Sequence, residues 1–241
     1  MKNKILCSGL FGILFIGEIV LLKKYDVAAI GPSGTEVGFS HINKACHDMT
    51  GVNMIWYEIT DYMGYAAIAL CMIFALAGLV QLIRRRSLFK VDREILALGG
   101  LFAVVIGFYL LFEKIIINYR PIIMPGEAEP EASFPSSHTM LIITVMIAIC
   151  IIIGKYVSIG AVRGIIRVLC IGAAVFTVGG RLYSGVHWLT DIIGGILLSV
   201  TLLFLFAAAA SGNNKSLPSA KGDRPVISER DRVINGYRTK H

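Results

Sequence analysis

Three ionisable residues lie close together in the segment GGRLYSGVHWLTDIIGG, residues 179–195: Arg181, His187 and Asp191. His187 and Asp191 are four positions apart, so their side chains would share a face on a helix. A carboxylate beside an imidazole can accept its Nδ1–H, which leaves Nε2 as a nucleophile or base and stabilises positive charge on the ring. An arginine can bind a pair of phosphate oxygens with its guanidinium fork. The segment therefore has the residue types for chemistry on a phosphate.

A second segment, PSSHT at residues 135–139, directly precedes an apolar run. Serine is favoured at helix N-caps, so we predict that a helix begins here with Ser136 or Ser137 as its cap. The free backbone N–H groups and the positive end of the helix dipole would then form an anion site. His138 would place a titratable proton donor beside that site.

A third segment, EKIIINYRP at residues 113–121, supplies two cations, Lys114 and Arg120. Arg120 offers a second guanidinium fork for phosphate oxygens. The loop that follows contains an acidic patch, which we interpret as a solvated loop rather than a catalytic group. Its members are Glu127, Glu129 and Glu131.

The surrounding sequence is typical of a membrane protein. Of its 241 residues, 56% are hydrophobic and 16% are charged, and the mean hydropathy is +0.72; soluble domains average about 25% charged residues. Six apolar runs approach or reach the roughly 17–25 residues that cross a bilayer. They are residues 5–22, 62–83, 95–117, 139–154, 162–179 and 192–210. We predict an all-α, polytopic protein of six transmembrane helices, with a membrane domain at 1–210 and a flexible basic cytoplasmic tail at 211–241.

The distribution of basic residues predicts the orientation in the membrane. If the N-terminus is cytoplasmic, 17 of the 23 Lys and Arg residues fall on the cytoplasmic side, which agrees with the positive-inside rule. Both termini are then cytoplasmic, and the outer loops are residues 23–61, 118–138 and 180–191. The last two hold most of the polar residues above, so we expect one shared site at the outer membrane face. The long loop 23–61 is either a lid or substrate rim, or an ordered structural loop.

Other features indicate what the protein lacks. The five cysteines show no pairing pattern, so we expect neither a disulfide framework nor a zinc site. Cys46 lies near His41, His47 and Asp48, but their spacing fits no ordered metal motif. The net charge of +7 follows the membrane topology, and we expect no nucleic-acid partner. The apolar N-terminus reads as a first span rather than a signal peptide, because Glu18 interrupts it and no small-residue cleavage signal follows.

These segments together resemble the membrane-bound type 2 phosphatidic acid phosphatase superfamily, the lipid phosphate phosphatases. That family carries three motifs: Lys, six residues and Arg-Pro; Pro-Ser-Gly-His; and Ser-Arg, five residues, His, three residues and Asp. Here the second motif reads PSSH at residues 135–138, and the third runs from Gly180-Arg181 through His187 to Asp191. Motif order, inter-motif distances and six spans agree over roughly residues 60–205.

The sequence departs from the family pattern at three positions. Ser137 replaces glycine, which a helix cap tolerates, and Gly180 replaces serine, which removes one phosphate contact. Lys114 lies six positions before Arg120 instead of seven, which turns the two side chains apart by about 120° on a helix. Glu113 occupies the family's lysine position. Either Lys114 still reaches the phosphate, or the site works without it; we favour the second.

The resemblance implies metal-independent hydrolysis of a phosphomonoester or diphosphate through a phosphohistidine, with no cofactor. His187 would attack phosphorus and Asp191 would orient it, while His138 would protonate the leaving oxygen and then activate water. The groups that would hold phosphate oxygens are Arg120, Arg181, Ser136, Ser137 and, if it takes part, Lys114.

The site's expected position at the headgroup level makes a membrane lipid the expected substrate. Undecaprenyl diphosphate, phosphatidic acid and phosphatidylglycerophosphate all fit, and the sequence does not choose among them. Two alternatives stay open: a phosphotransferase on the same scaffold, and a non-enzymatic membrane carrier. The oligomeric state is also open.

Overall fold

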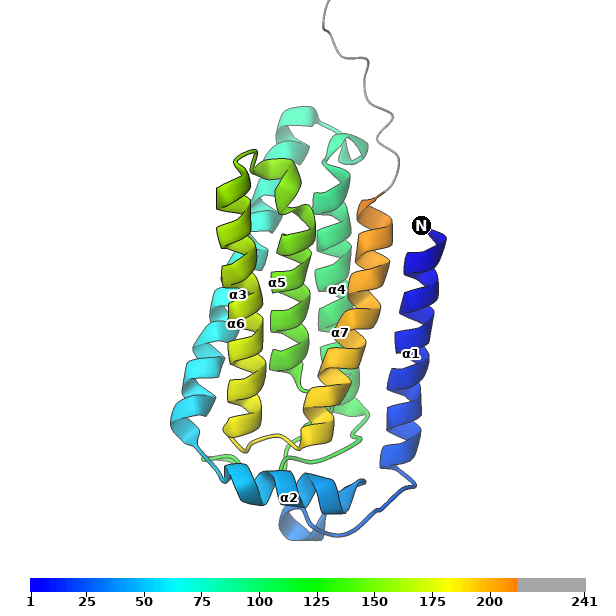
Figure 1. Cartoon of the computed structure of the whole chain (residues 1–241), viewed down its shortest axis with the longest axis vertical. Coiled ribbons are helices and arrows are strands. Elements are labelled where there is room, and N and C mark those ends of the chain that lie inside the picture. The colour runs from blue at the N-terminus through cyan, green and yellow to red at the C-terminus, as the bar shows by residue number, and fades with distance from the viewer. Residues whose placement is uncertain (212–241) are drawn as a thin grey trace, which may run out of the picture. The chain divides into compact units, whose positions relative to one another are not determined.

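The computed structural model describes residues 1–211, and every structural statement below concerns this part of the chain. It contains seven α-helices and two short 3₁₀ turns (Figure 1). The helices are α1 (Lys2–Leu22), α2 (Ser40–Thr50), α3 (Met54–Arg85), α4 (Arg93–Lys114), α5 (Ser137–Tyr156), α6 (Gly160–Tyr183) and α7 (Leu189–Ala210). The turns are η1 (Pro32–Gly34) and η2 (Leu88–Lys90). All helices except α2 are long and apolar enough to cross a membrane, which confirms the predicted all-α, polytopic fold.

The helix α3 begins earlier than the sequence predicts, at Met54 instead of residue 62. Asn53 caps it, because its side chain accepts a hydrogen bond from the N–H of Trp56 at 3.2 Å. Residues 54–61 mix apolar and polar side chains, so their hydropathy alone does not mark them as part of a membrane helix. The predicted outer loop 23–61 is therefore shorter and contains α2.

The third predicted loop is also shorter than expected. The helix α6 continues to Tyr183 and α7 begins at Leu189, so the connection between them is only residues 184–188. Arg181 is therefore helical, and Asp191 lies in the first turn of α7. His187 lies in the connection, just before the N-cap residue Trp188. The prediction that His187 and Asp191 share a helix face is thus wrong, although the two side chains remain close.

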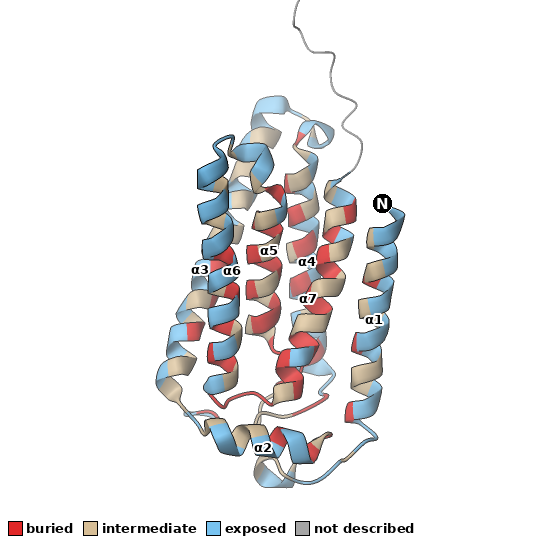
Figure 2. Cartoon of the chain, viewed as in Figure 1, coloured by how far each residue is buried: buried red, intermediate tan, exposed pale blue. Residues whose placement is uncertain are grey.

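The helices α5 and α7 form the centre of the bundle. Half of the apolar window of each is buried, against 6% for α3 and 11% for α6. Figure 2 shows the buried positions concentrated on the central helices and exposed ones on the outer helices. The helix α7 packs against α1, α4 and α5, and α5 also packs against α3 and α6. Outward apolar faces are expected of helices that contact lipid.

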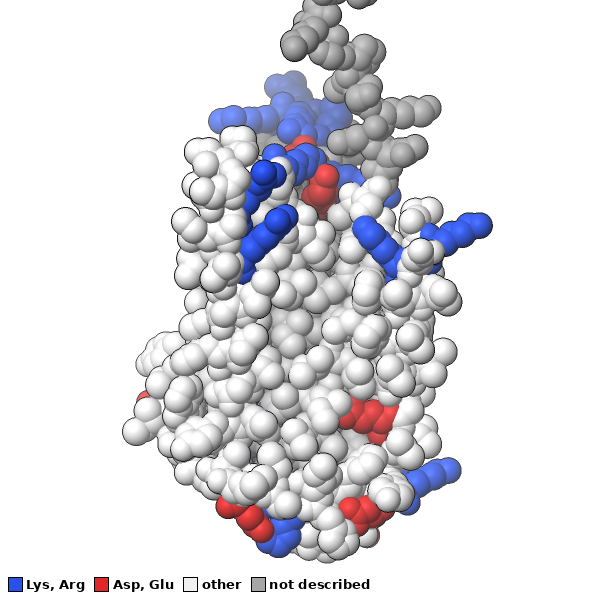
Figure 3. Space-filling model, viewed as in Figure 1, with Lys and Arg blue, Asp and Glu red and all other residues white. Residues whose placement is uncertain are grey.

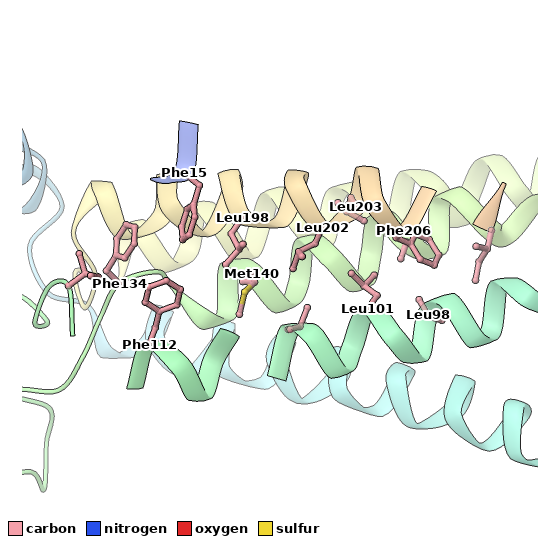
Figure 4. Close-up of a cluster of buried hydrophobic side chains, with 14 of the residues drawn as sticks. Phe15, Leu98, Leu101, Phe112, Phe134, Met140, Leu198, Leu202, Leu203 and Phe206 are labelled. Carbon is pink, nitrogen blue, oxygen red and sulfur yellow. The ribbon is translucent and has the colours of Figure 1, made fainter. Parts of the chain in front are cut away.

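An aromatic cluster anchors the segment that leads into α5 (Figure 4). Phe134 is almost fully buried, stacks on Phe15 at a centroid distance of 5.8 Å and meets Phe112 edge to face at 6.1 Å. Aromatic pairs at such distances add to the stabilisation that burial provides. Because Phe134 comes two residues before Ser136, the cluster fixes the start of α5 against α1 and α4.

Basic residues gather at one end of the bundle. Lys and Arg are most frequent at the end that carries the N-terminus, as the visible face in Figure 3 shows. The opposite end, called here the α2 end, comprises residues 23–53, 115–136 and 184–188 (Figure 1). The predicted basic tail at 211–241 lies outside the described residues, apart from Ser211.

Candidate active site

The loop between α4 and α5 is bound to the start of α7 at the α2 end. Tyr119 and Ala132 form an isolated antiparallel bridge that closes this loop on itself. The side chain of Asn118 donates to Oδ1 of Asp191 at 3.1 Å, and Trp188 Nε1 donates to the carbonyl of Tyr119 at 2.8 Å. These bonds hold three predicted parts of the site in one region: Arg120, the start of α5 and the α6–α7 connection.

Asp191 makes bonds that the sequence did not predict. Its Oδ2 accepts the N–H of Trp188 at 2.9 Å, the capping interaction of a residue in the first turn. Its Oδ1 is bound by Asn118. Nδ1 of His187 lies 3.6 Å from Oδ2, which is longer than a hydrogen bond. Asp191 therefore fixes the backbone at Trp188 directly and faces the ring of His187 at a small separation.

His187 is the titratable residue of the α6–α7 connection, and 2% of its side chain is exposed. Both ring nitrogens are buried without a hydrogen-bond partner among the described residues, although the backbone of Ser133 comes near the ring. Burial, together with the positive charges of Arg120 and Arg181, holds the pKa of His187 well below its ordinary value. The imidazole is therefore neutral at neutral pH, which is the form that can act as a nucleophile.

The start of α5 confirms the predicted cap. Ser136 is the N-cap, and its hydroxyl oxygen accepts the N–H of Thr139 at 3.4 Å. The N–H of Ser136 itself donates to the carbonyl of Asp191 at 2.9 Å, so it is already engaged. This corrects the expectation that the amide of Ser136 is free for an anion. The amides of Ser137 and His138 begin the helix and have no partner within it, as helix geometry requires.

His138 and Arg181 meet at a carboxylate that the sequence analysis did not single out. Oδ1 of Asp61, on α3, lies 2.8 Å from Nε2 of His138 and 3.3 Å from Nη2 of Arg181. Arg181 is fully buried, and its guanidinium also lies over the ring of Tyr57 at 4.7 Å. Its Nε is buried without a partner among residues 1–211. The interaction therefore joins α3, α5 and α6.

Arg120 is held by a second acidic residue. Its Nε donates to Oε2 of Glu131 at 2.8 Å, and its Nη1 donates to the carbonyl of Val186, next to His187, at 3.4 Å. Glu131 belongs to the loop that we interpreted as solvated, and its side chain is indeed partly exposed. One member of the acidic patch thus orients a site residue.

The family's lysine position is occupied by a residue of opposite charge. Glu113 lines a small polar cavity of about 30 Å³ together with Arg120, Ser137 and His187. Lys114 is exposed at the last residue of α4 and does not line this cavity. Of the predicted phosphate-binding residues, Arg120 and Ser137 line this cavity, and Lys114, Ser136 and Arg181 do not.

Gly180 allows α6 to approach α3 closely. A Cβ at this position would lie 2.6 Å from Cγ2 of Thr60 and 3.1 Å from the ring of Trp56. A serine, which the family has here, would therefore require these neighbours to shift. Glycine at position 180 thus fits the close packing of α6 against α3 next to Arg181.

A larger cavity adjoins the small one. It has a volume of about 430 Å³ and a mainly apolar lining between α3, α4 and α5, and it reaches Asp61 and His138. Tyr109, Ser137 and Met140 line both cavities. Ile68 and Ile106 also line the larger cavity and are exposed on the surface of the bundle, so it faces the lipid. A polar site thus adjoins an apolar groove.

The helix α2 covers the start of α7. Asn43 is fully buried; its Nδ2 donates to Oγ1 of Thr190 at 3.0 Å, and its Oδ1 accepts the N–H of Thr190 at 3.2 Å. His47 lies against the ring of Trp188 at 5.5 Å. These contacts fix α2 beside the α6–α7 connection. They favour the interpretation of the loop 23–61 as an ordered structural loop.

The residues near Cys46 are used in other contacts. His41 pairs with Asp26 through Nδ1 at 2.6 Å, and Lys44 pairs with Asp48. Within residues 1–211, no group of three or more His, Cys, Asp or Glu side chains is arranged to hold a metal ion. The absence of a metal from the reaction stays a prediction.

Two functional candidates were not predicted from the sequence: Asp61 and Asn118. Asp61 was assigned to an outer loop, and only the continuity of α3 through residues 54–61 places it opposite His138. Asp61 and Gly64 are three positions apart and share a face of a helix, and this spacing could have indicated that α3 includes Asp61. Asn118 is a neutral residue in a loop, and no pattern distinguishes it.

Comparisons with known proteins agree with the resemblance. Residues 114–215 match the PAP2 superfamily. A protein of Bacillus subtilis (strain 168) named phosphatidylglycerophosphatase B is 31% identical over 112 residues, which cover 44% of this chain and 55% of that protein. The match thus spans about half the length of the relative. A crystal structure described as the first transmembrane PAP2 type phosphatidylglycerolphosphate phosphatase from Bacillus subtilis has the same fold, with a TM-score of 0.60 at 19% identity over 84% of this chain and 94% of that one.

Proposed function

We propose that this chain, whose residues 114–215 match the PAP2 superfamily, is a lipid phosphatase of the membrane that acts through a phosphohistidine. The observation that carries the proposal is the set of buried nitrogens without a partner among the described residues, both of His187 and Nε of Arg181. Buried polar atoms in native proteins are nearly always hydrogen-bonded, so such orphans call for an explanation. Phosphate oxygens beside Arg181 and an electrophilic phosphorus beside His187 provide one.

The first chemical step follows from the positions of the two histidines. Nε2 of His187 attacks phosphorus while Asp191 faces Nδ1, and the bond from phosphorus to the leaving oxygen breaks. His138 gives that oxygen its proton. Arg120, Arg181 and the amides of Ser137 and His138 stabilise the charge on the remaining oxygens. In the second step His138 activates the water that hydrolyses the phosphohistidine.

The apolar groove beside the site supports a lipid substrate. A headgroup phosphate in the small cavity places its attached chain in the larger cavity, which faces the bilayer between α3 and α4. The named relative favours phosphatidylglycerophosphate, and phosphatidic acid and undecaprenyl diphosphate have the same combination of a phosphate and an apolar chain. The substrate class is a membrane lipid with a terminal phosphate.

The proposed orientation places both termini in the cytoplasm and the site on the outer face. In residues 1–211, ten Lys and Arg residues lie toward the N-terminal end of the bundle and six toward the α2 end. Under the positive-inside rule, this excess supports a cytoplasmic position for the N-terminal end. The orientation is tested with single cysteines introduced at Asp48 and at Arg86, by treating intact cells with a membrane-impermeant thiol reagent. The cysteine that replaces Asp48 should react, and the cysteine that replaces Arg86 should not.

The decisive assay for the function measures phosphate release from a panel of lipid phosphates by the purified protein, with EDTA present. Release of inorganic phosphate from at least one lipid supports metal-independent hydrolysis. Label that moves from the donor to a second lipid, without free phosphate, would instead identify a phosphotransferase. Release that requires an added divalent cation contradicts metal independence, and release from no member of the panel contradicts the proposed function.

A further inference from the structure

Asp61 provides a direct partner for His138 that lies outside the three motif segments. Its Oδ1 is 2.8 Å from Nε2 of the imidazole, a hydrogen-bond distance, and about three-quarters of each side chain is shielded from solvent. The carboxylate comes from α3 and the histidine from the first turn of α5. Two elements far apart in sequence are thus joined at the group that the proposed function uses as an acid.

The surface of α3 is also shaped around this ring. Gly64 lies one turn after Asp61, and a Cβ there would lie 2.8 Å from Cδ2 and 3.1 Å from Nε2 of His138. Contacts below 3.0 Å cannot be accommodated without a shift of the ring. Asp61 and Gly64 therefore define both the hydrogen bond and the space available to the imidazole.

The charges around His138 give this contact a chemical role. Nε2 of His138 pairs with Oδ1 of Asp61, and the cationic Nη2 of Arg181 lies 3.3 Å from the same carboxylate oxygen. A carboxylate bound to one ring nitrogen stabilises the imidazolium and fixes which nitrogen keeps its hydrogen.

We propose that Asp61 is a positioning residue for the general acid His138: it holds Nε2–H and so directs Nδ1 to the leaving oxygen. This inference rests on the proposed function and adds a residue to it. In the first step, the lone pair of His187 Nε2 forms the bond to phosphorus, the electron pair of the broken P–O bond stays on the leaving oxygen, and that oxygen takes the proton from Nδ1.

The second step reverses the proton transfer. Nδ1 of His138 takes a proton from water, the water oxygen bonds to phosphorus, and the electron pair of the N–P bond returns to His187. Asp61 keeps its charge in both steps and remains bound to Nε2–H. A carboxylate with this role resembles the orienting acid of other histidine-based sites in its physical effect.

If Asp61 had a purely structural role, its loss would affect all substrates equally. Arg181 is fully buried and lies 3.3 Å from the same carboxylate oxygen, so Asp61 could serve only to balance that charge. Loss of the carboxylate would then disturb the phosphate-binding arginine, and every substrate would be affected alike. A defect in proton donation instead depends on how badly the leaving group needs a proton.

The test compares two substrates of the purified protein in detergent, n-octyl phosphate and 4-nitrophenyl phosphate. The alkoxide leaving group needs a proton and nitrophenolate does not. Asp61→Asn should lower kcat/KM, which reports the first step and not the shared hydrolysis of the phosphohistidine, by about 100-fold on octyl phosphate and by less than about fivefold on nitrophenyl phosphate. Asp61→Glu should restore part of the loss. Glu58→Gln, an exposed acid on the same helix, is the matched control and should change neither rate.

Two further variants keep the inference testable if Asp61→Asn does not fold. Gly64→Ala retains every charge but displaces the ring, so it should also lower the octyl rate selectively. The double variant Asp61→Asn/His138→Asn should be no slower on octyl phosphate than His138→Asn alone. The ratio of the two rates is internal to each preparation, so a partly inactive sample does not alter it.

The outcomes separate this inference from the proposed function. Equal losses on both substrates in Asp61→Asn or Gly64→Ala, with an active wild type, overturn the role of Asp61 alone. Equal losses of kcat/KM on both substrates in His138→Asn overturn the assignment of His138 as the acid, and the inference with it. No phosphate release by the wild type from these two substrates or from any member of the lipid panel overturns the proposed function and therefore also the inference.

Discussion

Asp191 binds the N–H of Trp188 at 2.9 Å and lies 3.6 Å from Nδ1 of His187. The carboxylate thus sets the backbone turn that carries the imidazole and, at slightly longer range, faces the imidazole itself. A change at this residue can therefore alter both the position of the nucleophile and the charge beside it.

Asp191→Asn is expected to lower kcat by about 100-fold or more, because an amide cannot reproduce the charge beside His187. Its oxygen can still accept one hydrogen bond, from either Trp188 or Asn118. Steady-state kinetics on a lipid phosphate measure the loss. Asn118→Ala removes only the bond to Oδ1 and should cost less; equal or greater loss in Asn118→Ala would show that position, not charge, dominates.

The pH profile should reflect the neutral state of His187. Burial and the two arginines lower the pKa of this imidazole, and the neutral form is the nucleophile. Activity is lost when falling pH protonates the ring, so a lowered pKa moves this loss to lower pH. The acid limb of kcat/KM should therefore lie well below about 6.5, the ordinary value for histidine.

A matched variant checks that assignment. Arg120→Gln removes one of the positive charges that oppose protonation of His187, so its acid limb should move to higher pH while the rate falls. Both proteins are measured with the same substrate, so the titration of the substrate's own phosphate cancels. An unchanged acid limb in this variant contradicts the electrostatic account.

The first motif should depend on Arg120 and not on Lys114. Arg120 lines the small cavity, whereas Lys114 is exposed and outside it. We expect Arg120→Ala to lower kcat/KM by about 100-fold, within the range for loss of a charge-stabilising group. Lys114→Ala should stay within about twofold of wild type, as exposed charges contribute little. If both variants lose kcat/KM to a comparable extent, Lys114 does take part in phosphate binding.

Much of the site could be predicted from sequence because its residues contrast with their surroundings. Arg181, His187 and Asp191 are polar groups beside apolar runs, and ionisable residues in such places are costly and tend to mark function. The serine cap of α5 follows from local helix chemistry. These signals are local, so one sequence suffices to read them.

What the sequence could not provide is the set of partners across helices. Asp61 pairs with His138 and Glu131 with Arg120 only because α3 and the α4–α5 loop pack against the site. The shape of the α6–α7 connection was also missed, since a cap at Trp188 places His187 outside the helix. Contacts of this kind depend on tertiary packing, which periodicity and composition do not encode.

Packing around Gly180 gives a prediction about stability. Gly180→Ser introduces the family's residue but places Cβ 2.6 Å from Cγ2 of Thr60. Overpacking of this kind should lower the free energy of unfolding by about 1–3 kcal/mol, seen as a lower Tm in detergent. Adding Thr60→Ser removes the closest methyl group and should recover part of the loss. A Tm unchanged by Gly180→Ser alone contradicts the close approach of α6 and α3.

The most direct test of the account is to trap the phosphorylated protein. A substrate with a labelled phosphate and a good leaving group, 4-nitrophenyl phosphate, is mixed with the His138→Asn variant, in which the first step proceeds and the second is slow. The account predicts protein-bound phosphate that is stable to alkali and lost in acid, located at His187 by peptide mapping and absent when His187→Ala is added. Label on another residue, or phosphate release by His187→Ala at the wild-type rate, would contradict it.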